Sequence, residues 1–456
     1  MRLTLALAGV LALTMSACDE PSVDDGPKSP PVTDGDDNAS GDDGDDGEQT
    51  VPVKKDAGGT SSPNSGAKKD GSVAASGKDA GPARADAGQA AGGGDAGGPS
   101  EPEPGTPDVA EPTSGGDKPQ LAVSADFLNQ TLTVFNVDKM VEGASRKDVM
   151  VGQVDLSKYS PGPVALNITP DGKTALVSIS GSFLSYFVDV PPGDGILLFV
   201  DLEKLEVVGE LNTGKSPMGI VITPDGKKAF VGQLSENYFS YVDIEKRTFT
   251  KLNTGAQWNE ELAIDDTGTV GILTYGTAGN AKTFSIADPT KSGQTRGLTG
   301  DAGGTAFFPG TKTAFLVQAP TLLTGNVGGH NVIDVTDPLK PVASDDVRVT
   351  APSQYPCTAV HSRKTVVYPS YENKKAYLTE MRLEGNVATK AQQIEVGAAG
   401  NMPYGVSSTP DNRVLVAVPG DHYIGVVDLE TKKAFTVPWE VTKSGPNDIK
   451  MIPKTP

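Results

Sequence analysis

From about residue 119 onward, short apolar runs rich in β-branched and aromatic residues alternate with turns made of Gly, Asp, Asn and Pro. Runs of this length, bounded by turn residues, are typical of β-strands. The stretch shows little of the 3.6-residue periodicity that marks an amphipathic helix. The pattern therefore predicts an all-β domain over residues 119–456.

The apolar runs recur as a repeat in which a first strand leads into a Pro-Asp-Gly turn. Three copies are close, at Gly162 to Val177, Ser216 to Val231 and Met402 to Val416, and each contains two prolines seven residues apart. The pair Pro446 and Pro453 has the same spacing. Degenerate copies fill the gap, so that the units begin near residues 163, 217, 258, 302, 356, 403 and 446.

Four strands fit into each unit. The Pro-Asp-Gly hairpin joins the first two, and second strands are expected at Ala229–Gly232, Ala314–Val317 and Val414–Val418. A third strand often ends in Val-Asp or Ile-Asp, and a fourth runs to a glycine. Four strands in 40–50 residues are typical of one blade of a β-propeller, so the units predict a seven-bladed ring.

The seventh unit has only its first strand, Asn447–Ile452, at the C-terminal end. Its missing strands are available at Leu121–Ser124, Leu132–Val137 and Val149–Val154. One blade shared between N- and C-terminal strands would close the ring and remove its exposed edges.

The units resemble YVTN-type β-propeller repeats, whose pattern is Pro-x-Gly, an apolar stretch, Pro-Asp-Gly-Lys, a second strand and Val-Asp. The resemblance covers about residues 119–456, and it is close in the units at 163, 217 and 403 and weak in those at 258, 302 and 356. It implies a seven-bladed propeller that is often extracytoplasmic. It implies no single activity, because a fold does not fix a function.

The first residues have the order of an export signal. Arg2 is followed by an apolar run from Leu3 to Met15 and then by Ser16-Ala17-Cys18. This order resembles a lipobox, although Met15 stands where leucine is commonest. The resemblance implies that residues 1–17 are a lipoprotein signal peptide and that Cys18 is acylated and held in a lipid bilayer. An ordinary secretory signal that happens to contain a cysteine is the alternative.

Residues 18–118 are expected to form a disordered linker. Between 19 and 117 there is no Phe, Trp, Tyr, Leu, Ile or Met, so the segment cannot bury enough apolar surface to offset its chain entropy. It carries 22 acidic and 7 basic residues, most of the chain's net charge of −19. Neither this segment nor the repeats have the basic excess that nucleic-acid binding requires.

Aligning the units identifies polar residues at the start of the inner strands, which line the channel of a propeller. A polar, partly aromatic channel mouth is predicted to contain Trp258, Asn259, Glu260, Glu261, Tyr404, Asn447 and Asp448. The functional interpretation is a site for a cation or a polar ligand. The alternative is a water-filled channel with solvated acids.

No catalytic residue, cofactor or metal site is assigned from the sequence. His330, His361 and His422 lie in different units without metal-ligand spacing and are expected on the surface or in turns, although His361 could approach the channel. Cys357 is expected to be a small buried hydrophobe. The chain contains no Gly-x-Ser-x-Gly elbow.

The sequence thus favours a monomeric binding or scaffold module for a protein, peptide or glycan. It would stand in the cell envelope, on the periplasmic face of the inner membrane or on the outer membrane or cell surface. A lactonase-like hydrolase is one alternative. An accessory protein of a periplasmic redox system is another, without covalent haem because the chain has no Cys-x-x-Cys-His.

Replacing the cysteine of the signal tests the anchor. The Cys18→Ser chain is expected to leave the membrane fraction and to lose the acyl mass from its N-terminal peptide, because multiple acyl chains hold a lipoprotein stably in the bilayer. Membrane fractionation with mass spectrometry is the measurement, and Cys357→Ser is the matched control. An equal distribution of wild type and Cys18→Ser would contradict lipid anchoring.

Overall fold

The computed structural model describes residues 118–454, except 182–193, 276–279, 296–300, 320–328, 345–346, 349–355, 401–402, 440–442 and 444. The expected signal peptide, the expected lipidation site Cys18 and the linker up to residue 117 lie outside the described residues. No helix in the described part is long and apolar enough to cross a bilayer.

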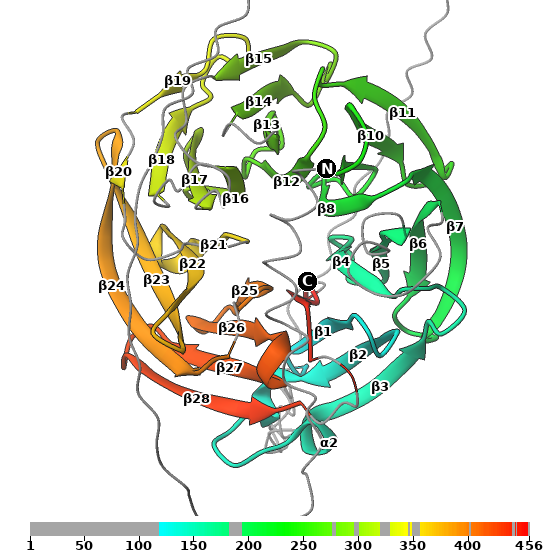
Figure 1. The fold of residues 1–456 in the computed structure, drawn as a ribbon, viewed down its shortest axis with the longest axis vertical. Helices are drawn as coiled ribbons and strands as arrows, with labels where there is room; N and C mark the ends of the chain where they lie inside the picture. Colours follow the sequence, from blue (N-terminus) through cyan, green and yellow to red (C-terminus); the bar gives the residue numbers. More distant parts are fainter. Residues whose placement is uncertain are drawn as a thin grey trace, which may run out of the picture. The chain divides into compact units, whose positions relative to one another are not determined.

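Seven antiparallel sheets follow one another around a central axis in the order of the sequence (Figure 1). Blades 1 to 3 each have four strands: β4 (Pro163–Ile168), β5 (Thr174–Ile179), β6 (Gly195–Asp201) and β7 (Glu206–Gly214); β8 (Pro217–Ile222), β9 (Lys228–Gln233), β10 (Tyr238–Asp243) and β11 (Thr248–Asn253); β12 (Asn259–Ile264), β13 (Val270–Tyr275), β14 (Asn280–Ser285) and β15 (Ser292–Thr295).

Blades 4 to 7 complete the ring. Their strands are β16 (Asp301–Phe307), β17 (Thr313–Ala319), β18 (Gly329–Asp334), β19 (Val342–Ala343) and β20 (Val347–Arg348); β21 (Thr358–Val360), β22 (Thr365–Glu372), β23 (Lys375–Glu384) and β24 (Val387–Ala398); β25 (Val406–Ser408), β26 (Arg413–Val418), β27 (Tyr423–Asp428) and β28 (Lys433–Pro438); and β29 (Asp448–Met451), β1 (Leu121–Asp126), β2 (Thr131–Asn136) and β3 (Met150–Asp155). The prediction of seven blades is confirmed.

The repeated Thr-Pro-Asp-Gly turn is held by its threonine. In blade 1 the Thr169 hydroxyl donates to the Asp171 carboxylate at 2.5 Å and accepts from the backbone N–H of Thr174 at 3.1 Å. The degenerate unit of blade 3 has Asp265 at the threonine position, and its carboxylate accepts from the backbone N–H of Val270 at 2.8 Å. A side-chain acceptor therefore fixes the same hairpin in both kinds of unit.

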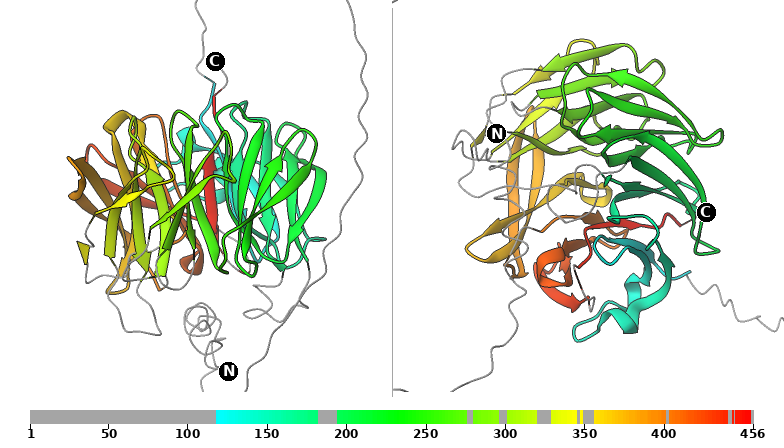
Figure 2. Two further views of the ribbon diagram at one scale, coloured as in Figure 1. Left: turned by 90° about the horizontal axis from the view of Figure 1, so that it is seen from above. Right: turned by 45° about the vertical axis from the view of Figure 1, so that its right-hand side comes forward.

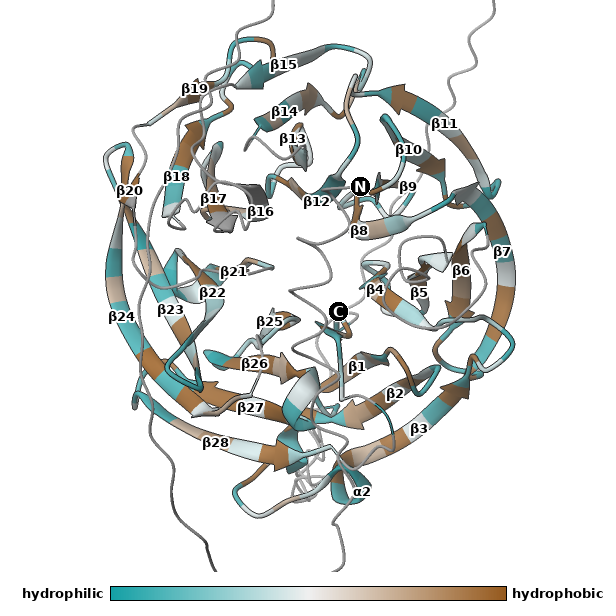
Figure 3. Cartoon of the chain, in the orientation of Figure 1, coloured by the Kyte–Doolittle hydropathy of each residue, from teal (hydrophilic) through white to brown (hydrophobic). Residues whose placement is uncertain are grey.

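Apolar side chains pack between neighbouring blades. In the described residues, seven clusters of buried side chains each join two consecutive blades. Between blades 2 and 3, for example, the rings of Phe230, Phe239 and Phe284 meet with centroids 4.9–6.1 Å apart. On the outer strand β24 the buried Ile394 and Val396 flank the exposed Glu395, and hydrophobic and hydrophilic bands follow one another along this strand in Figure 3.

Blade 7 is built from both ends of the repeat region. Strand β29 pairs antiparallel with β1, and the register places Asp448 opposite Ala125 and Met451 opposite Ala122. Figure 2 shows β29 in red beside the cyan strands. The shared closing blade predicted from the sequence is therefore confirmed.

A buried carboxylate ties blade 7 to the end of blade 6. Asp126 is fully buried, and it accepts hydrogen bonds from the Thr133 hydroxyl at 2.6 Å and from the indole N–H of Trp439 at 2.9 Å. The guanidinium of Arg146 lies 3.7 Å from the same carboxylate and 5.7 Å from the Trp439 ring. Burial raises the pKa of Asp126, although these donors and Arg146 act in the opposite direction.

Some local features differ from the sequence-based expectations. A short helix, α2 (Arg146–Val149), interrupts the expected all-β pattern, and the outer position of blade 4 is split between β19 and β20, which both pair with β18. The expectation that all three histidines lie on the surface or in turns is wrong for His330. That side chain lies on β18, is only 5% exposed and packs at 5.3 Å against the Phe315 ring.

Removing the indole donor tests the tie between blades 6 and 7. Trp439→Phe is expected to lower the free energy of unfolding by about 1.5–3 kcal/mol, because a buried carboxylate loses a hydrogen bond. Tyr423→Phe is the control, since it removes a neutral hydrogen bond to the Ala398 carbonyl, worth about 0.5–1.5 kcal/mol. Chemical denaturation is the measurement, and a smaller loss for Trp439→Phe than for the control would contradict this role of Asp126.

Candidate functional site

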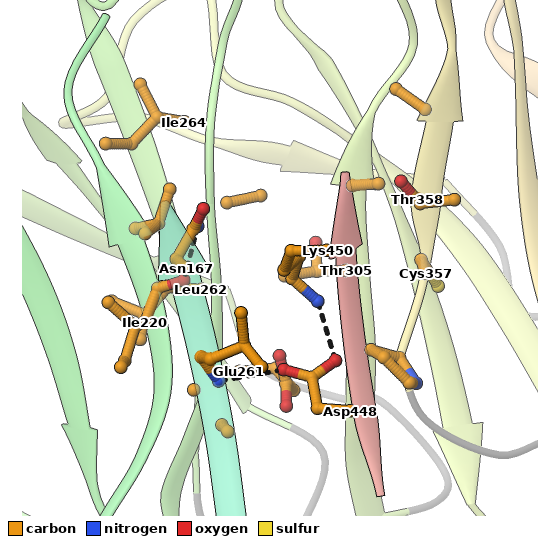
Figure 4. A pocket seen from close by; sticks show the side chains of 18 of the residues that line it. Asn167, Ile220, Glu261, Leu262, Ile264, Thr305, Cys357, Thr358, Asp448 and Lys450 are labelled. Atoms are coloured by element: carbon orange, nitrogen blue, oxygen red, sulfur yellow. Dashed lines mark hydrogen bonds and ion pairs between the residues drawn. The ribbon is translucent and has the colours of Figure 1, made fainter. Parts of the chain in front are cut away.

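The central channel contains a cavity of about 350 Å³ that receives residues from all seven blades. Its polar and charged lining residues are Asn167, Glu261, Asp266, Thr305, Cys357, Thr358, His361, Tyr404, Asp448 and Lys450. Figure 4 shows Glu261 and Asp448 next to each other at one level of the channel, with Lys450 close to Asp448 and Ile264 at a different level.

Glycines let the inner strands approach each other at the start of the channel. A Cβ atom on Gly219 would lie 2.7 Å from the Glu260 carbonyl oxygen, and one on Gly405 would lie 2.5 Å from the Asp448 Cα. Each glycine thus precedes a larger residue in the next blade. The close contacts are with backbone atoms, so a side chain at either glycine would force the inner strands apart.

Asp448 is a fixed carboxylate at the start of β29. It is 6% exposed, and it accepts backbone hydrogen bonds from the Leu166 and Ile449 N–H groups at 2.9 and 2.8 Å. The Lys450 ammonium lies 2.7 Å from one of its oxygens. Backbone donors and a lysine on its own strand therefore satisfy this carboxylate without any ligand.

Glu261, on β12 of blade 3, has a different environment. Its backbone N–H donates to the Thr274 hydroxyl at 3.2 Å, but no described residue donates a hydrogen bond to its carboxyl group. Burial, followed by the negative charges of Glu260 and Asp448, raises the pKa of Glu261 to about 8, and Lys450 opposes the shift. The carboxyl group is therefore mostly protonated at neutral pH.

Two further titratable groups face the same part of the cavity. Burial and the nearby acids Glu260, Glu261 and Asp448 raise the pKa of Tyr404 well above its usual value. Burial and the charge of Glu261 likewise raise the pKa of the Cys357 thiol. Cys357 is partly rather than fully buried and packs against the cluster between blades 4 and 5. Both groups therefore stay neutral near pH 7.

The structure brings three of the seven predicted mouth residues into the cavity: Glu261, Tyr404 and Asp448. Asn259 is instead fully buried, and its amide donates to loop carbonyls that include those of Glu236 and Ala256, at 2.8 and 3.1 Å.

The other predicted mouth residues lie next to the cavity rather than in its lining. Trp258 packs against a small apolar cluster that contains Met218 and Leu234. Asn447 donates to the Val164 carbonyl at 2.7 Å. Glu260 stands next to Glu261 on β12 and acts on it through its charge.

Sequence reasoning missed Lys450, Asn167 and Thr305 as lining residues. Lys450 stands two positions after Asp448 on the same strand, so the two-residue period of a β-strand could have placed both side chains on one face. Near another part of the lining, His361 lies 3.8 Å from the Asp266 carboxylate and is two-thirds exposed. The expectation that His361 could approach the channel agrees with its place in the lining.

The donor set does not resemble a metal centre. Within the described residues, no group of three or more His, Cys, Asp or Glu side chains is arranged to hold a metal ion. What the arrangement offers is one satisfied acid–lysine pair, one carboxyl group without a donor, and an apolar wall that includes Ile220 and Ile264. These are features of a pocket for a small, partly apolar ligand with a polar group.

The pH dependence of stability tests the environment of Glu261. The folded chain keeps the Glu261 proton up to about pH 8, whereas the unfolded chain loses it near 4.5, so this residue lowers stability as pH rises from 4.5 to 8. Glu261→Gln is expected to become progressively more stable than wild type across that interval, by at most about 5 kcal/mol. Denaturation at pH 5, 7 and 9 is the measurement.

Glu203→Gln, on an exposed turn of blade 1, provides the matched control and should track wild type at all three pH values. Parallel stability curves for wild type and Glu261→Gln would show that the carboxyl group is solvated and its pKa ordinary.

Comparison with known proteins identifies the fold and no family. No protein-family model and no curated protein sequence matches the chain. Among solved structures, the chain is similar to hydrazine synthase of Kuenenia stuttgartiensis, with a TM-score of 0.51, 16% identity, and coverage of 64% of this chain and 90% of that one. It is also similar to a functionally unknown protein from Desulfotomaculum acetoxidans, with a TM-score of 0.54, 12% identity, and coverage of 73% and 98%. At these identities the likeness concerns the fold alone: the chain is a seven-bladed β-propeller.

Proposed function

We propose that the chain is a lipid-anchored, extracytoplasmic binding module that receives part of a protein or peptide partner in its central channel. The observation that carries the proposal is the carboxyl group of Glu261, which faces the channel cavity and receives no hydrogen bond from a described residue. A carboxyl group at this place can gain a charge-assisted hydrogen bond when a partner supplies a donor, and such bonds are roughly twice as strong as neutral ones. A glycan is the alternative partner, whose hydroxyl groups could also donate to Glu261.

The proposed anchor suits this role. A flexible linker of about 100 residues has a root-mean-square reach of roughly 50–60 Å, which would let the propeller search for partners away from the lipid surface. The propeller offers a pocket whose shape depends on seven interlocked sheets and not on one mobile loop. A preorganised pocket loses little entropy on binding, which favours recognition.

Hydrolysis is the second candidate function, and one observation favours it. A carboxyl group with a pKa of about 8 can exchange a proton near neutral pH, as a general acid or base must. The neighbouring Cys357 thiol is held in its neutral form, which is the wrong state for a nucleophile. An accessory redox role gains no support beyond the fold shared with hydrazine synthase.

Cross-linking in intact cells tests the proposed function. A photoreactive residue at His361, an exposed part of the cavity lining, is expected to form an adduct of discrete mass that contains a peptide. The same residue at Glu203, on an exposed turn outside the channel, is the control and should give no such adduct. Glu261→Gln should reduce the yield at His361, because it replaces the carboxyl group that the partner contacts with an amide, which cannot ionise.

Equal labelling at His361 and Glu203, or no adduct at either, would count against a binding module. A protease-resistant adduct would identify a glycan partner instead. Turnover of lactones by purified wild type but not by Glu261→Gln would favour the hydrolase.

A further inference from the structure

Two carboxyl groups near the start of the channel, those of Asp448 and Glu261, differ in the hydrogen bonds that they accept from the protein. Asp448 already accepts from two backbone N–H groups and from Lys450. Glu261 lies beside it and receives no hydrogen bond from a described residue. Of these two carboxyl groups, Glu261 is therefore the one whose full capacity as an acceptor is left for a ligand.

The charges that face Glu261 come from two strands. Glu260 on β12 and Asp448 on β29 are negative, and Lys450 on β29 is positive but paired with Asp448. Tyr404, before β25, and Cys357, before β21, stay neutral. This end of the cavity is thus negative overall once Glu261 ionises, and it favours a cation over an anion.

The cavity lining also contains apolar residues. Ile220 and Val221 of β8 and Ile264 of β12 belong to the lining together with Glu261. The described residues supply no cluster of three ligands for a metal ion, and a volume of about 350 Å³ exceeds what a bare ion needs. A cation with an alkyl body can use both the acid and the apolar wall.

We propose that this cavity binds the ammonium group of an alkylamine against Glu261, with the alkyl chain along the wall formed by Ile220 and Ile264. The amine is either a free small molecule or the side chain of a lysine in a peptide. This inference rests on the proposed function, and it names the chemistry of the ligand.

Binding of this kind releases a proton. Below pH 8 the free protein holds a neutral Glu261 carboxyl group and the free amine is already an ammonium ion, because alkylamines resemble lysine with a pKa of about 10.4. The complex pairs a carboxylate with an ammonium ion, so the carboxyl proton passes to the solvent. The affinity should rise roughly tenfold per pH unit up to about pH 8 and stay level above it.

Calorimetry with the full-length chain in detergent tests the proposal. The ligands are n-butylamine and a short peptide with blocked ends and one lysine, and n-butanol and butyrate are the neutral and anionic controls. Titrations in two buffers of different ionisation enthalpy should show about one proton released per bound amine at pH 6.5 and about none at pH 9.5.

Glu261→Gln should bind the amine at least about tenfold more weakly at pH 9.5 and release no proton. Glu203→Gln removes the same charge from an exposed turn and should bind like wild type. The butylamine and peptide arms distinguish a free amine from a lysine side chain.

Equal binding of butylamine and butanol, or amine binding that Glu261→Gln leaves unchanged, would overturn the inference. If the amines fail to bind while the His361 adduct forms in cells, the proposed binding function stands and the amine chemistry is wrong. If the amines bind with proton release while no adduct forms, the amine site stands and the partner-binding function is wrong.

Discussion

Pairing of β29 with β1 is the interaction on which the rest of the propeller depends. Six blades are made of consecutive strands, whereas blade 7 joins segments from opposite ends of the repeat region. The buried Asp126 carboxylate strengthens the same junction, because it accepts from Trp439 at the end of blade 6, 313 residues away. The channel cavity exists only in the closed ring, since its lining comes from every blade.

Most of the fold could be predicted because the repeated sequence motif contains the residues that form the hairpin turns. Threonine and aspartate side chains hold the hairpins of blades 1, 2 and 6, so the motif that identifies these units is also the motif that shapes them. The burial of His330 was missed because a histidine beside glycines suggests a loop. Its place two residues before the buried Val332 on β18 gives it the same face, and this signal could have corrected the expectation.

The candidate site could be predicted only in part. Aligning the units shows which residues occupy equivalent positions, but it does not show which way their side chains point. Glu261 and Asp448 line the cavity, but Asn259 turns away from it to bind loop carbonyls in the preceding blade. The direction of such a side chain depends on which carbonyl groups the folded loops bring within hydrogen-bonding distance. The periodicity of the sequence does not predict this. The donors also differ, because the Asp448 carboxylate accepts from Leu166 in the next blade as well as from its sequence neighbour Ile449, whereas the Glu261 carboxyl group receives no hydrogen bond from a described residue.

Strand β29 has a further consequence, because it supplies both the closing strand of the ring and two charged residues of the cavity, Asp448 and Lys450. Its pairing with β1 joins residues far apart in sequence, so it forms slowly compared with the local hairpins of the other blades. The ligand proposed for the channel would touch the strand whose departure opens the ring. Its binding would favour the closed state by mass action and slow unfolding, so that the resistance of this propeller to proteolysis would report whether its channel is filled.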